Sequence, residues 1–339
     1  MNYQEILQQA RGNMGPYCKA CPVCNGMACK NSVPGPGAKG LGTGAIRNYQ
    51  KWQELCVNMD TICENKDVDT SVTLFGRQFA LPVFAAPVGA LQMHYGDKYN
   101  DLEYNDILVS ACAKAGIAAF TGDGVNPAVI QATAKALTNA NGCGVPTIKP
   151  WNIDIVREKM DLVKPAAPFA IAMDIDGAGL PFLKNMTPPA GSKTVEELAE
   201  IAKIAEVPFI LKGIMTVKGA LKALEAGASA IVVSNHGGRV QGGVPSTAEV
   251  LPAIADAVKD RITILVDGGI RSGVDVFRAL ALGADGVLIG RPILTAIYGA
   301  GEEGFKVYMD KIVGELKSTM TMCGTATLKD INRSNIWQA

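Results

Sequence analysis

The sequence predicts an α/β fold, a (β/α)8 barrel of the TIM type, and two observations lead to this prediction. From residue 81 onward, eight short apolar runs alternate with longer amphipathic segments, as parallel strands joined by helices do. Polar or glycine-rich residues follow essentially every apolar run. Barrels of this type carry their chemistry at the carboxyl ends of the strands, so the second observation indicates a functional rim.

The expected strands and helices follow one another in regular order. The strands are expected at residues 81–86, 117–121, 144–148, 168–173, 208–211, 230–233, 263–266 and 286–289. The helices are expected at residues 105–115, 126–137, 195–205, 217–226, 248–258 and 273–282, and several end at a glycine that would cap them. We therefore expect a barrel over residues 71–339, with a Cys/Gly-rich segment over residues 1–70 that packs on it.

Composition and charge favour a small-molecule ligand over a macromolecular one. The chain has 339 residues, with 32 Lys and Arg balanced by 32 Asp and Glu, so no net charge attracts nucleic acid or an anionic membrane. No apolar run approaches the roughly 18 residues of a spanning helix, and no signal peptide is visible. We therefore expect a cytoplasmic protein that binds neither nucleic acid nor membrane.

Four of the nine cysteines gather near the N-terminus, at Cys18, Cys21, Cys24 and Cys29. Their spacing is C-x2-C-x2-C-x4-C, and a Gly/Pro-rich stretch follows at residues 34–44. Thiolates at such intervals can converge from one loop on a single ion or cluster, as in zinc and iron–sulfur sites. The ferredoxin pattern differs, because it has three residues before its last cysteine and a proline after it. Metal ligation, a local disulfide and reduced structural thiols are all compatible with the spacing.

A polar cluster directly follows the expected strand at residues 230–233. It contains Ser234, Asn235, His236 and Arg239, and His236 is one of only two histidines in the chain. Neutral imidazole is the side chain best suited to general-base chemistry near pH 7, so His236 is a candidate catalytic base. The alternative is an ordinary surface turn after a core strand.

The last two expected strands end in sequences suited to phosphate binding. Asp267, Gly268, Gly269 and Arg271 follow the seventh strand, and Gly290 and Arg291 follow the eighth. Barrels bind phosphate at these two loops through glycine backbone N–H groups, and each loop here adds an arginine. No G-x-G-x-x-G motif opens a helix near the start, so a Rossmann-bound nicotinamide is not supported.

Taken together, these motifs resemble the FMN-dependent 2-hydroxy acid oxidases and dehydrogenases, a family that includes glycolate oxidase, lactate oxidase and mandelate dehydrogenase. The resemblance covers about residues 70–336. It is strongest at the Leu-Lys-Gly-Ile of residues 211–214, the Ser-Asn-His-Gly-Gly-Arg of residues 234–239 and the Asp-Gly-Gly-Ile-Arg of residues 267–271, and extends to residues 279–284 and 290–292. The resemblance implies FMN as cofactor and a homotetramer.

The resemblance also implies roles for individual residues. His236 matches the base, Asp176 the carboxylate that orients it, Arg239 the anchor of the substrate carboxylate, and Lys212 the lysine beside flavin N1 and O2. An ordinary rim ion pair between Lys212 and Asp176 is the alternative. Flavin-contacting positions fall on Ala86, Pro87, Val88, Gly89, Asp174, Lys212, Ser234, Asp267, Gly268, Gly269, Arg271, Gly290 and Arg291.

The chain departs from the family at the substrate side. Two substrate-contacting tyrosines of the family are absent; Lys149 stands in place of one, and the cysteine-rich segment replaces the stretch that carries the other. Lys149 is a candidate second cation for a substrate carboxylate, the alternative being a solvated rim lysine. The cysteines are expected either to form part of the substrate-pocket wall or to carry electrons to or from the flavin.

The resemblance therefore implies FMN-dependent oxidation of a 2-hydroxy acid to the 2-oxo acid, with a histidine base and hydride transfer to flavin N5. In the rival description, the base removes the α-proton first. The electron acceptor is not specified by the sequence. The resemblance implies one other than oxygen, because Gly89 stands where the oxidases of the family tend to carry Ala and dehydrogenase members can carry Gly. The first alternative is a flavin-dependent isomerase of the type 2 isopentenyl diphosphate isomerase kind, against which the His-Gly-Gly-Arg of residues 236–239 argues. The second is a non-catalytic FMN or metal redox sensor.

Overall fold

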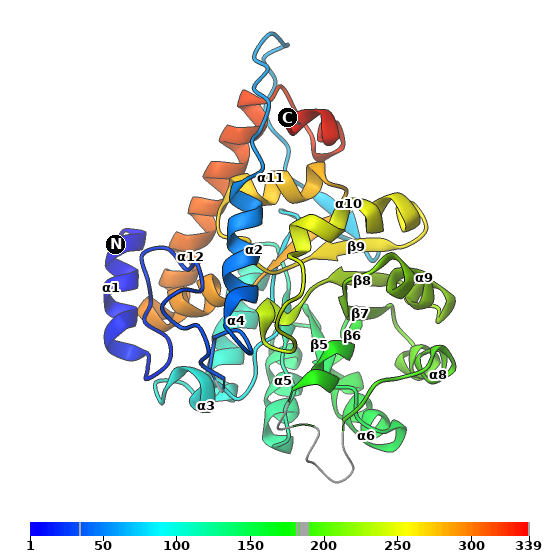
Figure 1. Ribbon diagram of the computed structural model, residues 1–339. Coiled ribbons are helices and arrows are strands. Elements are labelled where there is room, and N and C mark those ends of the chain that lie inside the picture. The colour runs from blue at the N-terminus through cyan, green and yellow to red at the C-terminus, as the bar shows by residue number, and fades with distance from the viewer. Residues whose placement is uncertain (34, 181–182, 184–189, 338–339) are drawn as a thin grey trace.

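The computed structural model describes residues 1–33, 35–180, 183 and 190–337, and at its centre is a closed barrel of eight parallel strands (Figure 1). The order around the barrel is β10-β3-β4-β5-β6-β7-β8-β9, which confirms the predicted (β/α)8 fold. The strands are β3 (Val83–Ala85), β4 (Ala119–Thr121), β5 (Gly144–Ile148), β6 (Ile171–Asp174), β7 (Phe209–Ile214), β8 (Ala230–Val233), β9 (Thr263–Val266) and β10 (Gly286–Ile289). Four of them have the bounds expected from the sequence.

Helices surround the barrel, and two of them were not expected from the sequence. The surrounding helices are α4 (Asp101–Lys114), α5 (Pro127–Asn139), α6 (Ile153–Val163), α8 (Val195–Ala205), α9 (Val217–Glu225), α10 (Thr247–Val258), α11 (Gly273–Ala281) and α12 (Arg291–Met322). The sequence analysis did not assign α6 or α12. Helix α12 is kinked at Ala300 and Gly301, where non-helical backbone angles interrupt its periodicity.

Local side-chain hydrogen bonds fix where several helices begin. A polar residue before the first turn accepts a hydrogen bond from the third helical residue, whose own side chain accepts one in return. This arrangement starts each helix at a defined distance from the preceding strand and so shapes the loops at the barrel rim. The pairs are Asn100 with Glu103, Thr194 with Glu197, Ser246 with Glu249, and Ser272 with Asp275.

The inside of the barrel is filled by apolar side chains from alternate strand positions. A two-stranded hairpin, β1 (Val72–Leu74) and β2 (Arg77–Phe79), packs on the same cluster, and the rings of Phe79 and Phe84 meet edge to face at 5.0 Å. The amino-terminal end of the barrel is therefore plugged, as expected for a packed core rather than a pore. The interior residues include Phe84, Phe120, Val145, Ala172, Ile210, Val232, Leu265 and Leu288.

The first 53 residues lie against the barrel as two helices joined by a long loop (Figure 1). Helix α1 (Tyr3–Asn13) packs on α12, and Ile6 is fully buried between them. Helix α2 (Thr43–Gln53) packs on α10 and α11, across the loops that follow β8 and β9. No helix in the described part of the chain is long and apolar enough to cross a membrane.

The contact between α1 and α12 can be tested with two glycines of the same helix. A Cβ atom at Gly299 would lie 2.5 Å from the carbonyl oxygen of Ile6, whereas a Cβ at Gly314 would meet nothing within 4 Å. We expect Gly299→Ala to lower the free energy of unfolding by roughly 1–3 kcal/mol, because the backbone of α1 must move. Gly314→Ala should raise it by up to about 1 kcal/mol through helix propensity.

Urea denaturation of both variants measures this difference. Equal effects of the two substitutions would show that α1 does not pack tightly on α12.

Candidate functional site

The floor of the site is the last interior layer of the barrel. Side chains along a strand alternate between the two faces, so each apolar interior row continues two residues later at the carboxyl end of its strand. In five rows the next interior residue is polar. These residues are Thr147 after Val145, Asp174 after Ala172, Lys212 after Ile210, Ser234 after Val232 and Asp267 after Leu265. The fold thus brings polar groups from five separate strands onto one buried surface.

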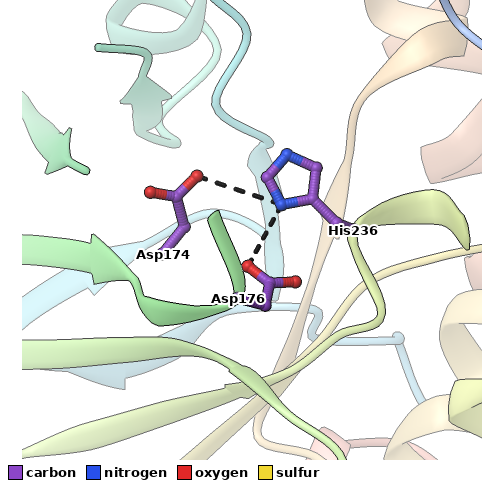
Figure 2. A group of neighbouring side chains, drawn as sticks. All are labelled: Asp174, Asp176 and His236. Atoms are coloured by element: carbon purple, nitrogen blue, oxygen red, sulfur yellow. Dashed lines mark hydrogen bonds and ion pairs between the residues drawn. The ribbon is translucent and has the colours of Figure 1, made fainter. Parts of the chain in front are cut away.

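A histidine flanked by two carboxylates stands on this surface (Figure 2). The Nδ1 atom of His236 lies 3.1 Å from Oδ1 of Asp176 and 4.0 Å from Oδ2 of Asp174. Figure 2 shows that the other ring nitrogen points away from both carboxylates. We assign the Nδ1 proton to the bond with Asp176, which leaves Nε2 as the unprotonated nitrogen.

The backbone at His236 is strained in a way that suits a functional residue. Its φ angle is +56°, a left-handed conformation that few residues other than glycine adopt. Gly237 and Gly238 after it also have positive φ angles, and the His236 N–H donates to the Ser234 hydroxyl at 3.1 Å. The turn therefore aims the imidazole at the carboxylates instead of continuing the strand.

Burial and charge keep the imidazole neutral. Burial lowers the pKa of His236 well below its ordinary value, and the positive charges of Lys212 and Lys149 lower it further. Asp174 opposes this effect, but the ammonium group of Lys149 forms an ion pair with it. His236 is thus an unprotonated base across the physiological pH range.

Lys212 is a buried cation, and its partners are not those of the ion pair with Asp176 that the sequence analysis gave as the alternative. Its Nζ atom lies 3.2 Å from Oδ2 of Asp267 and donates to the Ser234 hydroxyl at 2.9 Å. Burial alone would lower the pKa of Lys212, but the carboxylates of Asp267, Asp176 and Asp174 raise it. The alternative prediction, an ordinary rim ion pair between Lys212 and Asp176, is wrong. Asp176 is hydrogen-bonded to His236, and Lys212 forms its ion pair with Asp267.

Helix α2 holds the two loops that carry these groups. The side-chain amides of Asn48 and Asn235 exchange hydrogen bonds of 2.7 and 2.9 Å, and the Trp52 indole donates to the carbonyl of Gly268 at 2.8 Å. A Cβ at Gly44 would lie 3.0 Å from the Cα of Gly238, so helix and loop pack backbone to backbone. The turn around His236 is therefore fixed by the N-terminal segment as well as by β8.

The polar floor opens into a cavity of about 620 Å³. The residues predicted from sequence divide between its wall and the layer behind it. Asp176 and Ser234 stand behind the wall and support His236 and Lys212. The wall includes Ala86, Pro87, Val88, Gly89, Lys149, Asp174, Lys212, His236, Arg239, Asp267, Gly268, Gly269, Arg271, Gly290 and Arg291.

The cavity also has lining residues that the sequence analysis did not select. His94 and Tyr95 end the short helix α3 (Leu91–Tyr95), which follows β3 and its loop, and Asp123 follows β4. The tyrosine provides a phenol in a pocket where none was expected. A signal was present, because these residues lie in the segments that follow barrel strands, the positions that line such sites.

The cysteine-rich segment does not form the wall of this cavity. Among the described residues, those that line it begin at Ala86. Residues of the segment instead hold the site from outside: the carbonyls of Gly35 and Pro36 accept from Arg239 Nε and Arg291 Nη1, each at 3.1 Å. The expectation that the cysteines border the substrate is therefore wrong, because their loop packs behind the arginines.

Comparison with known protein families identifies this architecture. The family described as FMN-dependent dehydrogenase matches residues 36–180 and 181–338, nearly the whole chain. The chain belongs to the FMN-dependent dehydrogenase family. The match includes every barrel strand and all the residues of the polar floor.

Relatives within this family match parts of the sequence, and solved structures match its fold. A peroxisomal (S)-2-hydroxyacid oxidase of Arabidopsis thaliana is 45% identical over 141 residues, 42% of this chain and 39% of the relative. An L-lactate dehydrogenase of Pectobacterium atrosepticum is 49% identical over 143 residues, 42% of this chain and 37% of the relative. The chain thus spans about two fifths of these relatives. A mandelate oxidase variant solved with (S)-mandelic acid has a TM-score of 0.81 at 25% identity, covering 100% of this chain and 98% of that one.

The cavity fits the flavin that the family implies. Its volume lies within the range of cofactor sites. Three buried polar atoms that have no hydrogen-bond partner among the described residues are Nη2 of Arg271, Oδ1 of Asp267 and Oγ1 of Thr147. Since buried polar atoms are nearly always paired, these atoms indicate a polar ligand. Arg271 and Arg291, with the backbone of Gly269, would hold the phosphate.

The trio of His236, Asp174 and Asp176 is also close enough to hold a cation, since one ligand atom from each lies within 4.8 Å of the others. The adjacent ammonium groups of Lys149 and Lys212 make this a poor metal site. Asp174 is already paired with Lys149, and both lysines act electrostatically on His236. We therefore interpret the trio as a base with its orienting carboxylates.

The role of Arg271 can be tested by changing its shape while keeping its charge. We expect Arg271→Lys to weaken FMN binding roughly tenfold or more, because a lysine cannot make the paired contacts of a guanidinium. Quenching of FMN fluorescence on titration measures this affinity. The matched control is Arg157→Lys on the exposed face of α6, which should bind FMN normally; equal affinities in both variants would contradict the assignment.

The buried His94 and the largely buried His236 make stability depend on pH. Burial lowers the pKa of His94 to about 4, assisted by the charges of Arg239 and Lys149, and the pKa of His236 is lowered too. Below pH 6.5 the unfolded chain takes up protons that the folded chain does not, so stability falls as the pH falls. Between pH 6.5 and pH 5.5, each histidine should lower the free energy of unfolding by roughly 1 kcal/mol.

Urea denaturation at these two pH values checks the expectation. His94→Gln should remove about half of the histidine-dependent loss, and an unchanged loss would show that His94 is not buried as a neutral ring.

Proposed function

We propose that this protein oxidises a 2-hydroxy acid to the corresponding 2-oxo acid with bound FMN, as an FMN-dependent dehydrogenase or oxidase. The observation that carries the proposal is the hydrogen-bonded pair of His236 and Asp176. His236 lines a cavity that fits a flavin, and its ring nitrogen Nε2 points away from the carboxylates. A base held neutral beside the cations Lys212 and Lys149 suits removal of a proton from a bound alcohol. The relatives named hydroxyacid oxidase and lactate dehydrogenase support the same reaction class.

Arg239 would anchor the substrate carboxylate. Its Nε donates to the Gly35 carbonyl, whereas its buried Nη2 has no hydrogen-bond partner among the described residues. A guanidinium with one edge fixed and another available is suited to a carboxylate. Lys149 lines the same cavity, but its charge is matched by Asp174, so we assign Lys149 to holding Asp174 in place.

Proton transfer would then run through His236 alone. The unprotonated Nε2 accepts the hydroxyl proton, while Asp176 stabilises the imidazolium that forms at Nδ1. The short distance between Nδ1 and Asp176 means that the ring need not turn during the reaction. Asp176 is therefore a positioning residue that sets the tautomer and supports the transient charge.

Lys212 would offset the negative charge that accompanies oxidation. FMN, when bound, supplies a two-electron acceptor for the electrons that leave the substrate. Lys212 remains positively charged in its buried position because three carboxylates surround it. A fixed buried cation next to developing negative charge stabilises the transition state without reorganisation.

Two further features belong to the proposal. We place the protein in the cytoplasm, since none of the described cysteines forms a disulfide. We also propose a homotetramer, as the family resemblance implies. The segment that carries Met59 and Ile62 supports self-association, because these apolar side chains are 71% and 97% exposed.

The decisive experiment is anaerobic mixing of the FMN-loaded protein with lactate, glycolate and mandelate in a stopped-flow spectrometer. We expect one acid to bleach the flavin absorbance of the wild type. His236→Gln should keep its flavin but be bleached on the order of 10²–10⁴-fold more slowly, because the base is lost.

Dithionite should reduce the flavin of both proteins equally, which controls for an intact cofactor site. Bleaching of His236→Gln at the wild-type rate would remove His236 from the mechanism. A wild type that no 2-hydroxy acid bleaches would overturn the proposed reaction.

A further inference from the structure

The loop between α1 and α2 contains a second, small cavity with an unusual lining. All four cysteines of the N-terminal motif border it, together with Arg291 from the rim of the barrel. The remaining lining is largely apolar and comes from α1, the loop and the start of α12. Thiols so gathered on one cavity are a typical preformed ligand set.

From this arrangement we infer that Cys18, Cys21, Cys24 and Cys29 bind a four-iron iron–sulfur cluster. The inference goes beyond the proposed oxidation, because none of the four cysteines takes part in that chemistry. It also does not depend on that reaction, since the proposed ligands of the cluster are not residues of the oxidation site.

The backbone of this loop is folded so that the cysteines converge. Turns with positive φ angles occur at Ala20 and Gly26, between successive cysteines. Arg11 Nε donates to the carbonyl of Ala20 at 3.1 Å, and a Cβ at Gly26 would lie 2.8 Å from the Cβ of Ala45. The loop is thus held from α1 on one side and from α2 on the other, so the ligands are ordered in advance.

The barrel also holds the middle of the motif. Arg271 Nε donates to the carbonyl of Cys24 at 2.6 Å. The guanidinium group of Arg291 borders the same cavity. These cations would balance the negative charge that four thiolates give to a bound cluster.

The spacing of the thiols favours a cluster over a single ion. Tetrahedral zinc at roughly 2.3 Å from each sulfur would bring the sulfurs to within about 4 Å of one another. Among the described residues, the groups whose ligand atoms all lie within 4.8 Å do not include these cysteines. The four thiols nevertheless border one cavity. A cluster with its ligands at separate corners suits this wider arrangement.

Arg291 links the two sites, because it lines both cavities. On the flavin side it is a phosphate ligand in the proposal above, and on the other side it borders the cysteines. The cluster would therefore lie behind the phosphate end of the flavin cavity. Its neighbours across the loop would be Tyr3 of α1 and Pro292 of α12.

The test is chemical analysis of the full chain purified without air and then incubated with ferrous iron and sulfide. We expect about four iron atoms and four acid-labile sulfides per chain, a broad absorbance beyond the flavin bands, and a paramagnetic signal after reduction with dithionite. Stoichiometric zinc without sulfide would overturn the inference. So would wild-type protein that retains less than one iron per chain after desalting.

Cysteine variants locate the site. Cys21→Ser and Cys29→Ser should each lose most of the iron and sulfide, whereas the matched controls Cys56→Ser and Cys63→Ser, at exposed cysteines outside the motif, should keep both. Circular dichroism and FMN content show whether each variant is folded. Equal iron in all four folded variants would overturn the assignment of the ligands. If the motif variants do not fold, the wild type can be alkylated at its free thiols before the incubation. Loss of iron and sulfide from the alkylated protein supports the assignment of the cysteines as ligands, and retention of iron and sulfide overturns this assignment.

Discussion

The constraint on which this structure depends is the alternation of side chains along eight strands closed into a barrel. Because each strand turns every second residue inward, the interior is a stack of layers whose members come from different strands. The lower layers are apolar and, with the β1–β2 hairpin, exclude water. The uppermost layer is polar, and no neighbouring layer covers it, so a ligand site forms there.

The charges of that layer stabilise one another in a defined pattern. Lys212 is paired with Asp267, Lys149 with Asp174, and His236 with Asp176. Each lysine compensates a carboxylate that would be costly to bury alone, while burial, helped by the positive charges of Lys212 and Lys149, keeps the imidazole neutral. The same groups that stabilise the floor of the barrel therefore determine the protonation state on which the proposed chemistry depends.

The N-terminal segment holds the loops and arginines of the barrel rim in place. Helix α2 fixes the loops after β8 and β9 through Asn48 and Trp52, and the loop before it provides carbonyl partners for Arg239 and Arg291. The cysteine cavity is bordered by Arg291, which also lines the larger cavity. Because the N-terminal segment holds Arg291, and Arg291 borders both cavities, we regard this segment as part of the functional unit.

The sequence by itself determined the barrel, because the two-residue and helical periodicities of local segments report directly on burial. It also selected His236, Arg271, Arg291 and the glycine loops as candidate site residues, since these stand at strand ends that can be read along the chain. Only the tertiary structure decided which charges pair. It placed Asp267 rather than Asp176 against Lys212, brought Tyr95 to the cavity and set the cysteines behind Arg291. Such partners are tens to hundreds of residues apart, and their meeting depends on strand order and barrel closure, which no local pattern encodes.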